Sequence, residues 1–305
     1  MANSICAVVV TYNRKELLLN CLNALQNQTY PLDHIVVVNN ASSDGTIDFL
    51  NENGWCDNDH LTIINLPENQ GGAGGFYAGI EFAYQRNFDY IWLMDDDGQP
   101  SKNSLSALIP YINTDVYIGP LVLNINNSDE LTFTLRLPKS STILSTIDDV
   151  NKNTISNIIP DIVMPFNGIL FSREMVSKIG LPKKEYFIWG DDMEYTWRAK
   201  KEGYKIFTVV ESIFFHPKEL TLGTPMFFNL MKFNDTDSKL KLYCMSRNNF
   251  RNLVDYKGSV IAILFIIKLC WFFLFTKPNL SKLKIGLKGI WHGVKGDFSH
   301  HREYL

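Results

Sequence analysis

The chain has 305 residues, of which 46% are hydrophobic and 20% are charged, so it can form one large α/β domain or two smaller ones. A formal net charge of −3 argues against general nucleic-acid binding. The five cysteines are scattered and form no CxxC pair, which favours a reducing, cytoplasmic compartment over a disulfide framework.

Strand and helix patterns alternate through the first third of the chain. Residues 5–10 form an apolar, β-branched run that is too short for a secretory signal and typical of a buried parallel strand. Apolar spacing predicts a helix over residues 17–25, and the same reasoning predicts strands at 35–38, 61–66 and 90–94, with helices from residue 46 and over 77–86. This order predicts a mostly parallel, doubly wound α/β sheet that binds its ligands beyond the carboxyl ends of its strands.

The rest of the chain is less regular. Residues 114–165 are rich in Ser, Thr, Asn and Asp, which predicts irregular structure or a disordered loop. Short β-like runs follow at 206–210 and 213–215, and the later pattern is mainly helical. We therefore expect an α/β domain over residues 1–250 and a helical, basic, amphipathic tail over 251–305.

The first acidic motif is Asp95-Asp96-Asp97, directly after an apolar strand. Three adjacent carboxylates repel one another unless a cation offsets their charge. Alternate residues of an extended segment point the same way, so Asp95 and Asp97 are candidate ligands of Mg²⁺ or Mn²⁺. A solvated acidic turn before Gly98 and Pro100 is the alternative.

The second acidic motif is Asp191-Asp192, after Trp189-Gly190 and before a predicted helix. A helix N-terminus lowers the pKa of a nearby carboxyl group, which would keep a general base ionised. Capping of the helix by Asp191 is the alternative, although it leaves Asp192 unexplained. Trp189 is either a core residue or a platform for a sugar ring.

Three further features lie where such sheets bind ligands. His216 follows a β-like stretch and is either a third metal ligand or a core residue. The glycine-rich segment 71–75 suits close approach of a phosphate or a tight turn, but it matches neither GxGxxG nor a P-loop. Tyr12 and Arg14 follow the first strand, so they are candidates to contact a base and a phosphate, or ordinary loop residues.

The tail carries an apolar run at 259–276, interrupted by Lys268, and an amphipathic stretch at 280–294. Seven lysines and no acidic residue lie between residues 256 and 296. A central lysine argues against a membrane span, so we expect an interfacial helix that contacts a membrane peripherally. A core-packing helix pair is the alternative.

Taken in order, these motifs resemble glycosyltransferase family 2. The resemblance runs over residues 4–250 through 8–14, 39–46, Asp95-Asp96-Asp97, 189–194 and His216. Within the family, residues 71–76, 92–97 and 189–192 look most like bacterial galactofuranosyltransferases, and rhamnosyltransferases of O-antigen and capsule assembly are similar. The resemblance implies a GT-A fold and an inverting, metal-dependent reaction.

The resemblance also assigns roles to individual residues. Asp192 is the expected catalytic base, with Asp191 beside it, and Trp189 and Glu194 are expected at the acceptor. Asn39 stands where many relatives have the Asp that binds a pyrimidine edge. The expected metal ligands are Asp95, Asp97 and His216. The expected contacts to a UDP- or dTDP-sugar donor are Thr11, Tyr12, Arg14, Asn39, Asp44, Gly72, Asp95 and Asp96.

The predicted activity is transfer of galactofuranose from UDP-galactofuranose to a glycan or undecaprenyl-linked acceptor at the inner face of the bacterial plasma membrane. Transfer of rhamnose from dTDP-rhamnose is the alternative within the family. A glycoside hydrolase needs two carboxylates but no cation, and a non-catalytic glycan-binding protein would not need both acidic motifs. The sequence leaves open whether the chain self-associates.

Overall fold

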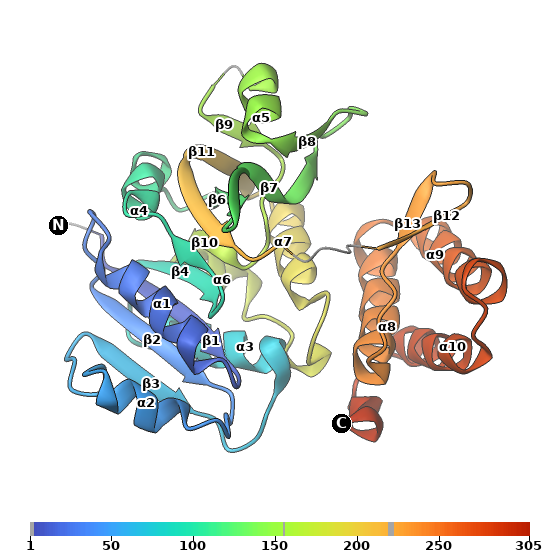
Figure 1. The fold of residues 1–305 in the computed structure, drawn as a ribbon, viewed down its shortest axis with the longest axis horizontal. Coiled ribbons are helices and arrows are strands. Elements are labelled where there is room, and N and C mark those ends of the chain that lie inside the picture. The colour runs from blue at the N-terminus through green and yellow to red at the C-terminus, as the bar shows by residue number, and fades with distance from the viewer. Residues whose placement is uncertain (1–2, 155, 219–222) are drawn as a thin grey trace. The chain divides into compact units, whose positions relative to one another are not determined.

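The computed structural model describes residues 3–154, 156–218 and 223–305 (Figure 1). The chain divides into two compact units, which are described separately. Unit 1 comprises Met1–Gln70, Gly75–Leu181 and Ala199–Lys218, and unit 2 comprises Gly71–Gly74, Pro182–Arg198 and Glu219–Leu305. The expected domain boundary at residue 250 falls inside helix α8 (Lys239–Tyr256), so the compact units do not follow it.

Unit 1 is built around a large mixed sheet. Its strands are β1 (Ile5–Thr11), β2 (His34–Asn39), β3 (Leu61–Asn65), β4 (Tyr90–Asp95), β5 (Gln99–Pro100), β6 (Val116–Asn124), β7 (Asn127–Arg136), β8 (Ile143–Thr146), β9 (Ile158–Pro160), β10 (Asn167–Ser172) and β11 (Lys205–His216). Its helices are α1 (Lys15–Gln26), α2 (Thr46–Glu52), α3 (Gly71–Gln85), α4 (Ser104–Leu108), the 3₁₀ turn η1 (Ile109–Tyr111), α5 (Ile147–Asn153) and α6 (Arg173–Ile179). Helix α3 begins in unit 2, and helix α7 (Asp191–Lys201) begins in unit 2 and ends in unit 1.

The sheet has the order β3-β2-β1-β4-β10-β6-β11-β5. Strands β3, β2, β1 and β4 are parallel, β10 runs antiparallel to both β4 and β6, and β6 pairs in parallel with β11. The predicted α/β class and parallel first half are confirmed. The antiparallel strand β10 marks the second half of the sheet.

Alternating side chains of β1 serve two helix layers. Ala7 and Val9 belong to the core that contains the apolar face of α1 (Leu18, Cys21, Leu22 and Leu25). On the opposite face, α3 approaches so closely that a Cβ on Gly79 would lie 2.3 Å from Cγ1 of Val8. Successive strand residues point to opposite faces, so this single strand accounts for a helix on each side of the sheet.

Two local predictions are corrected by the structure. Helix α3 begins at Gly71 rather than at residue 77, so the glycine-rich segment forms its first turn. Residues 114–165 are not a disordered loop, because β6 lies at the centre of the sheet and is buried throughout. The polar residues that hid this strand belong largely to the turns and exposed strand faces around it.

Unit 2 is mainly helical and contains a small hairpin. Its elements are η2 (Lys184–Tyr186), β12 (Thr224–Met226), β13 (Met231–Phe233), α8, α9 (Ser259–Trp271), the π-helical turn η3 (Phe272–Thr276), α10 (Leu280–Lys295) and η4 (Ser299–Tyr304). Helix α10 packs closely on α8 because Gly289 and Gly293 lie against main-chain atoms of Tyr243 and Arg247. The expected apolar stripe of α10 is therefore divided: Ile290 is buried, whereas Trp291 is exposed.

Ser259–Thr276 is the one described helical segment that is long and apolar enough to cross a membrane. Only 22% of this segment is buried. The predicted helix is therefore present, with most of its apolar surface uncovered.

The close packing of α3 on the sheet predicts a cost for any side chain at Gly79. In Gly79→Ala the new Cβ meets Val8, so we expect the free energy of unfolding to fall by about 1–3 kcal/mol, the usual cost of overpacking. Alanine favours helices, so a helix-propensity effect alone would have the opposite sign. Urea unfolding measures the change, with the exposed Gln85→Ala on the same helix as control. An equally stable Gly79→Ala protein would contradict this packing.

Candidate active site

Polar residues meet at the carboxyl ends of the parallel strands. Thr11 at the end of β1 is in register with Asn39 at the end of β2. Val10 of β1 is in register with Asp95 at the end of β4, so Asp96 and Asp97 extend beyond the same edge. This is the edge at which doubly wound sheets bind their ligands.

Asp96 is buried and fully engaged. Its Oδ2 accepts a hydrogen bond from Thr11 Oγ1 at 2.8 Å, and its Oδ1 pairs with an Arg14 guanidinium nitrogen at 3.2 Å. Burial raises the pKa of Asp96 to about 6, against the lowering effect of Thr11 and Arg14. Thr11 is 1% exposed and its hydroxyl positions Asp96. The expected contact of Thr11 with a donor stays a prediction.

Asp97 lies between two basic groups. Its Oδ2 is 2.8 Å from the same Arg14 nitrogen, and its Oδ1 is 3.2 Å from His216 Nε2. Although burial alone would raise the pKa of Asp97, the hydrogen bond and charge of His216 and the charge of Arg14 lower it. Although burial alone would lower the pKa of His216, Asp97 raises it.

The tautomer of His216 shows what this pair lacks. Pro217 O can only accept a hydrogen bond, so Nδ1 of His216 donates to it at 2.7 Å, and Nε2 of a neutral ring carries a lone pair. Two acceptors then face one another, and Oδ1 of Asp97 is buried without a hydrogen-bond donor. A proton or a metal cation would satisfy both atoms. One carboxylate oxygen and one imidazole nitrogen therefore fit a divalent ion.

Two of the three predicted metal ligands lie together in the structure. Asp97 and His216 are together, but within residues 3–154, 156–218 and 223–305 no group of three His, Cys, Asp or Glu side chains is arranged to hold a metal. The placement of Asp95 with this pair stays a prediction.

The loops after β1 and β2 support one another. Asn13 Oδ1 accepts the Ser43 N–H at 2.7 Å, and Asp44 accepts hydrogen bonds from Thr46 and from the Lys15 N–H. Burial alone would raise the pKa of Asp44, but these hydrogen bonds lower it, so it is ionised at neutral pH. Asp44 therefore organises the loop, and its predicted contact with a donor stays a prediction.

The other predicted donor contacts differ in exposure. Tyr12 is 44% exposed and leaves a ring face for stacking. Asn39 is 5% exposed, and its amide already bonds Asn65 Oδ1 and the Ser42 N–H. The main chain of Gly72 lies in the first turn of α3. No ligand contact of these residues is tested by the structure.

The second acidic motif opens helix α7. Asp191 is its first residue, whereas the motif was expected to precede the helix, and Asp192 Oδ1 accepts the N–H of the next residue, Met193, at 2.7 Å. The expected lowering of the pKa by the helix is corrected. Burial raises the pKa of Asp192, and burial together with the charge of Asp192 raises the pKa of Asp191.

The loop before α7 is strained. Phe187, Trp189 and Gly190 have φ angles of 65°, 68° and 88°, a region that large L-residues rarely occupy. Trp189 is half-buried against the apolar cluster of unit 2, and its predicted acceptor contact is untested. Such strain persists only when surrounding contacts determine the conformation.

Helix α8 supplies those contacts through buried polar side chains. The amide nitrogen of Asn248 donates to the carbonyl oxygens of Tyr186, Ile188 and Trp189 at 3.0, 3.1 and 2.6 Å. Asn252 donates to Gly190 O at 2.7 Å and accepts from the Tyr186 hydroxyl at 2.8 Å. Asn248 and Asn252 therefore fix the segment that leads into Asp191 and Asp192. Their roles were not predicted, because their partners are main-chain atoms distant in sequence.

Glu194 has a structural role in this unit. Its carboxylate is fully buried and accepts from Arg198 Nη2 at 2.6 Å and from the Tyr256 hydroxyl at 2.6 Å, with Lys183 Nζ at 3.2 Å. These partners use the carboxylate to join α7 to α8, and the expected contact of Glu194 with an acceptor stays a prediction.

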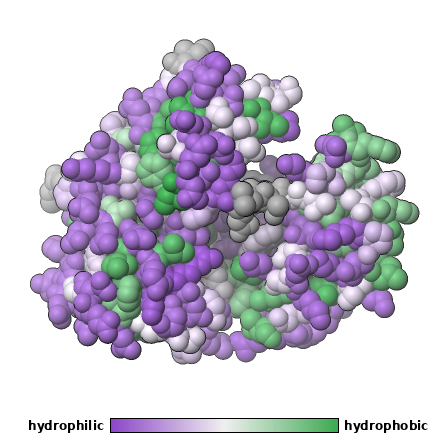
Figure 2. All heavy atoms as spheres, viewed as in Figure 1, coloured by the Kyte–Doolittle hydropathy of each residue, from purple (hydrophilic) through white to green (hydrophobic). Residues whose placement is uncertain are grey.

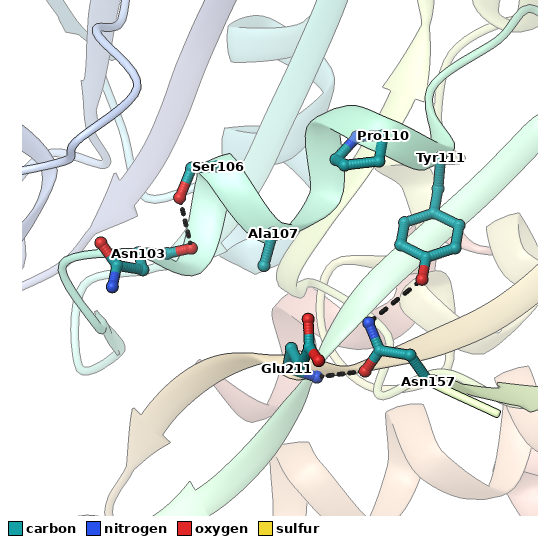
Figure 3. A pocket seen from close by; sticks show the side chains of 7 residues that line it. All are labelled: Asn103, Ser106, Ala107, Pro110, Tyr111, Asn157 and Glu211. Atoms are coloured by element: carbon teal, nitrogen blue, oxygen red, sulfur yellow. Dashed lines mark hydrogen bonds between the residues drawn. The ribbon is translucent and has the colours of Figure 1, made fainter. Parts of the chain in front are cut away.

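A separate cavity of about 400 Å³ lies in unit 1 (Figure 3). It is lined by Asn103, Ser106, Ala107, Pro110, Tyr111, Asn157 and Glu211. The Asn157 side chain donates to the Tyr111 hydroxyl at 3.1 Å and accepts the Glu211 N–H at 2.9 Å. None of these residues belongs to either acidic motif, so the cavity is distinct from the predicted site.

Comparison with known families identifies the enzyme class. The model of glycosyl transferase family 2 matches residues 6–179, more than half of the chain. The chain belongs to glycosyltransferase family 2. It is an inverting hexosyltransferase, as the sequence motifs predicted.

Curated relatives match nearly the whole chain. Galactofuranosyltransferase GlfT1 of Mycolicibacterium smegmatis is 28% identical over 92% of this chain and 93% of its own length. Galactofuranosyltransferase GlfT1 of Mycobacterium tuberculosis H37Rv is 28% identical over 97% of this chain and 94% of its own length. The chain is therefore a galactofuranosyltransferase-like member of the family.

Solved structures confirm the GT-A fold. GalNAc-T7 with UDP, GalNAc and Mn²⁺ matches with a TM-score of 0.61 and 17% identity, over 83% of this chain and 50% of that chain. Staphylococcus aureus TarS 1–349 in complex with UDP-GlcNAc matches with a TM-score of 0.57 and 15% identity, over 96% and 81% of the two chains. At these identities the likeness shows the fold alone.

The buried amide of Asn248 yields a test of how Asp192 is positioned. Asn248→Asp keeps the shape but replaces three donated hydrogen bonds with repulsion from three carbonyl oxygens. We expect kcat to fall at least about tenfold with little change in donor KM, because Asp192, the predicted base, is displaced. Steady-state kinetics of folded protein measures the split, and the exposed Asn151→Asp is the control. Equal loss of kcat and donor affinity would point to general disruption instead.

Proposed function

We propose that this enzyme transfers galactofuranose from UDP-galactofuranose to a glycan or lipid-linked glycan acceptor in bacterial cell-surface polysaccharide synthesis. The proposed donor is supported by the match to galactofuranosyltransferases, which covers more than nine-tenths of both chains. Both acidic motifs are intact and engaged in ordered networks, which favours catalysis over simple glycan binding.

In the proposed reaction, unit 1 binds the donor diphosphate. Arg14 is 51% exposed at its side chain and can turn part of its guanidinium toward phosphate while it offsets Asp96 and Asp97. Asp97 and His216, joined by Asp95 as predicted, are the residues that would hold a divalent cation. That cation would supply positive charge to the diphosphate and to the departing UDP.

The second acidic motif supplies the proposed base. Asp192 removes the proton from an acceptor hydroxyl, whose oxygen forms a bond to the anomeric carbon as the bond from that carbon to the diphosphate oxygen breaks. Burial raises the pKa of both carboxyl groups, and the charge of an ionised Asp192 raises the pKa of Asp191 further, so Asp191 keeps its proton when Asp192 is ionised. Raised basicity suits Asp192 to this role near neutral pH.

We also place the enzyme at the cytoplasmic face of the membrane. The uncovered apolar segment Ser259–Thr276 supports peripheral contact with a membrane, and Lys257, Lys284 and Lys295 support attraction to anionic lipid. Three other lysines of residues 256–296, Lys277, Lys282 and Lys288, pair with Asp235, Asp237 or Glu303. This location would suit an undecaprenyl-linked acceptor.

A donor screen tests the proposed function. The full chain is incubated with UDP-galactofuranose, UDP-galactopyranose or dTDP-rhamnose, with Mn²⁺ or Mg²⁺ and a synthetic galactose-terminated lipid acceptor. We expect transfer from UDP-galactofuranose with inversion and its loss in EDTA. Transfer from dTDP-rhamnose alone would contradict the proposed donor. Full activity in EDTA would contradict the proposed metal requirement.

The raised pKa values of the second acidic motif predict the acid limb of the pH profile. The base must be ionised, so a raised pKa makes activity disappear at a higher pH than for an ordinary aspartate near 4. Asp191→Asn should leave the acid limb of kcat/KM near its wild-type pH, because a protonated Asp191 carries no charge and burial is the main cause of the raised pKa of Asp192. Asp192→Asn should lower kcat by about 10² or more with donor binding retained. The exposed Asp115→Asn is the control; a limb that moves to lower pH in Asp191→Asn would contradict a protonated Asp191 beside the base.

The Asp97–His216 pair predicts a specific change in metal requirement. His216→Ala removes one candidate ligand, so we expect a higher Mn²⁺ concentration for half-maximal transfer and some remaining activity at saturation. Metal titrations of the rate measure this shift, with the exposed His60→Ala as control. An unchanged metal requirement would make His216 a purely structural residue.

A further inference from the structure

The turn between β12 and β13 displays apolar side chains where turns usually display polar ones. Phe228 is 98% exposed and Leu230 is 82% exposed, and Met231 follows at 44%. Turns favour Gly, Asn, Asp and Ser, so a large apolar pair at the tip is not required by the local fold.

The backbone of this turn adds to the contrast. Phe227, Phe228 and Asn229 have φ angles of 47°, 54° and 67°, and the Leu230 N–H closes the turn on Phe227 O at 3.0 Å. The left-handed region suits Asn but disfavours Phe. Phe228 is therefore unfavourable both in its backbone conformation and in its exposure to water.

The base of the hairpin is firmly packed on the uncovered helical segment. Phe227 stacks on Trp271 with ring centroids 4.6 Å apart, and Phe233 stacks on Phe272 at 4.5 Å. Met226 and Phe233 are buried in the same cluster. The tip is thus held in a fixed place beside α9 and η3.

Apolar exposure continues onto these helices. Figure 2 shows hydrophobic residues gathered over this unit. The exposed apolar residues of α9 and η3 are Val260, Ile261, Ile263, Leu264, Ile267, Trp271, Leu274 and Phe275. Large exposed apolar surfaces mark interaction sites rather than ordinary solvent-facing surface.

Basic side chains point to one kind of partner. Lys232 is exposed on β13, and residues 223–234 contain no acidic side chain, while the next acidic residue, Asp235, pairs with Lys277 and Lys282. Elsewhere in unit 2 or on α7, Lys295 and Lys257 lie over the rings of Trp291 and Trp197, at 4.7 and 4.5 Å from the ring centroids. Apolar tips combined with lysines and tryptophans match the boundary of an anionic bilayer, where acyl chains meet phosphates.

We propose that the β12–β13 turn inserts Phe228 and Leu230 into the acyl boundary of an anionic membrane, as a second anchor beside α9 and η3. Two separated anchors would fix the rotation of unit 2 on the membrane, which one helix alone would not. This inference deepens the membrane location in the proposed function and does not depend on the identity of the sugar.

Phe228→Asn is the most direct test, because two effects of the substitution have opposite signs. Asparagine adopts the left-handed region more readily, so the thermal midpoint should stay equal or rise. Co-sedimentation of the full chain with vesicles of phosphatidylglycerol and phosphatidylcholine should weaken about tenfold, since a large apolar side chain no longer inserts. Ile125→Asn, which replaces an exposed apolar residue in a turn of unit 1, should bind as the wild type does.

Further measurements separate this inference from the function. Phe228→Leu should retain most of the binding, whereas Phe228→Asn/Leu230→Asn should lose more than the single variant. Transfer to a short water-soluble acceptor should be unchanged in all of them, and its absence in the wild type would count against the proposed function only. Wild-type vesicle binding by Phe228→Asn would overturn the inference. So would loss of self-association without loss of vesicle binding, because a second copy would then be the occupant.

Discussion

Three adjacent carboxylates at the end of buried strand β4 cannot all remain charged without compensation. In unit 1 this constraint is met by Arg14, which pairs with both Asp96 and Asp97, and by His216 at Asp97. One acceptor, Oδ1 of Asp97, still lacks a donor when His216 is neutral. The charge balance is therefore complete only with a proton or a cation at that position. In the proposed reaction the site binds a diphosphate and then releases it. This arrangement suits such a site, because the proton or cation at Asp97 can be exchanged.

The second acidic motif depends on a different constraint. The main chain before Asp191 is held in positive-φ conformations, and buried amides of α8 satisfy the carbonyl groups that this path exposes. The strain is local, but its support comes from a helix more than fifty residues further along the chain. Helix α8 also contributes the Tyr256 hydroxyl that bonds Glu194, and it packs against the glycines of α10. The second acidic motif and helix α10 thus share one supporting helix.

Apolar runs and strand-end polarity were sufficient to predict the parallel half of the sheet. They also predicted the edge that carries Asp95, Asp96 and Asp97, because each strand there is buried on both faces. The centre of the sheet was missed, since β6 lies between polar turns that dominate its composition. The pairing of His216 with Asp97 was anticipated by the hypothesis that His216 is a third metal ligand, which the family resemblance supported. The role of Asn248 was not predicted, because it depends on contacts with main-chain atoms distant in sequence. The exposed apolar turn at Phe228 was not predicted either, because side-chain exposure has no local sequence signature.

The central claim is that the Asp97–His216 pair exchanges a proton for a divalent cation. NMR titration of the His216 imidazole of the full chain, without metal and with saturating Mg²⁺ and UDP, tests it most directly. The account predicts a pKa above the usual histidine value without metal, since Asp97 stabilises the protonated ring. It also predicts that this titration moves to distinctly lower pH when Mg²⁺ is bound, because the cation competes with the proton for Nε2. An identical titration curve in the presence and absence of Mg²⁺ would contradict the account.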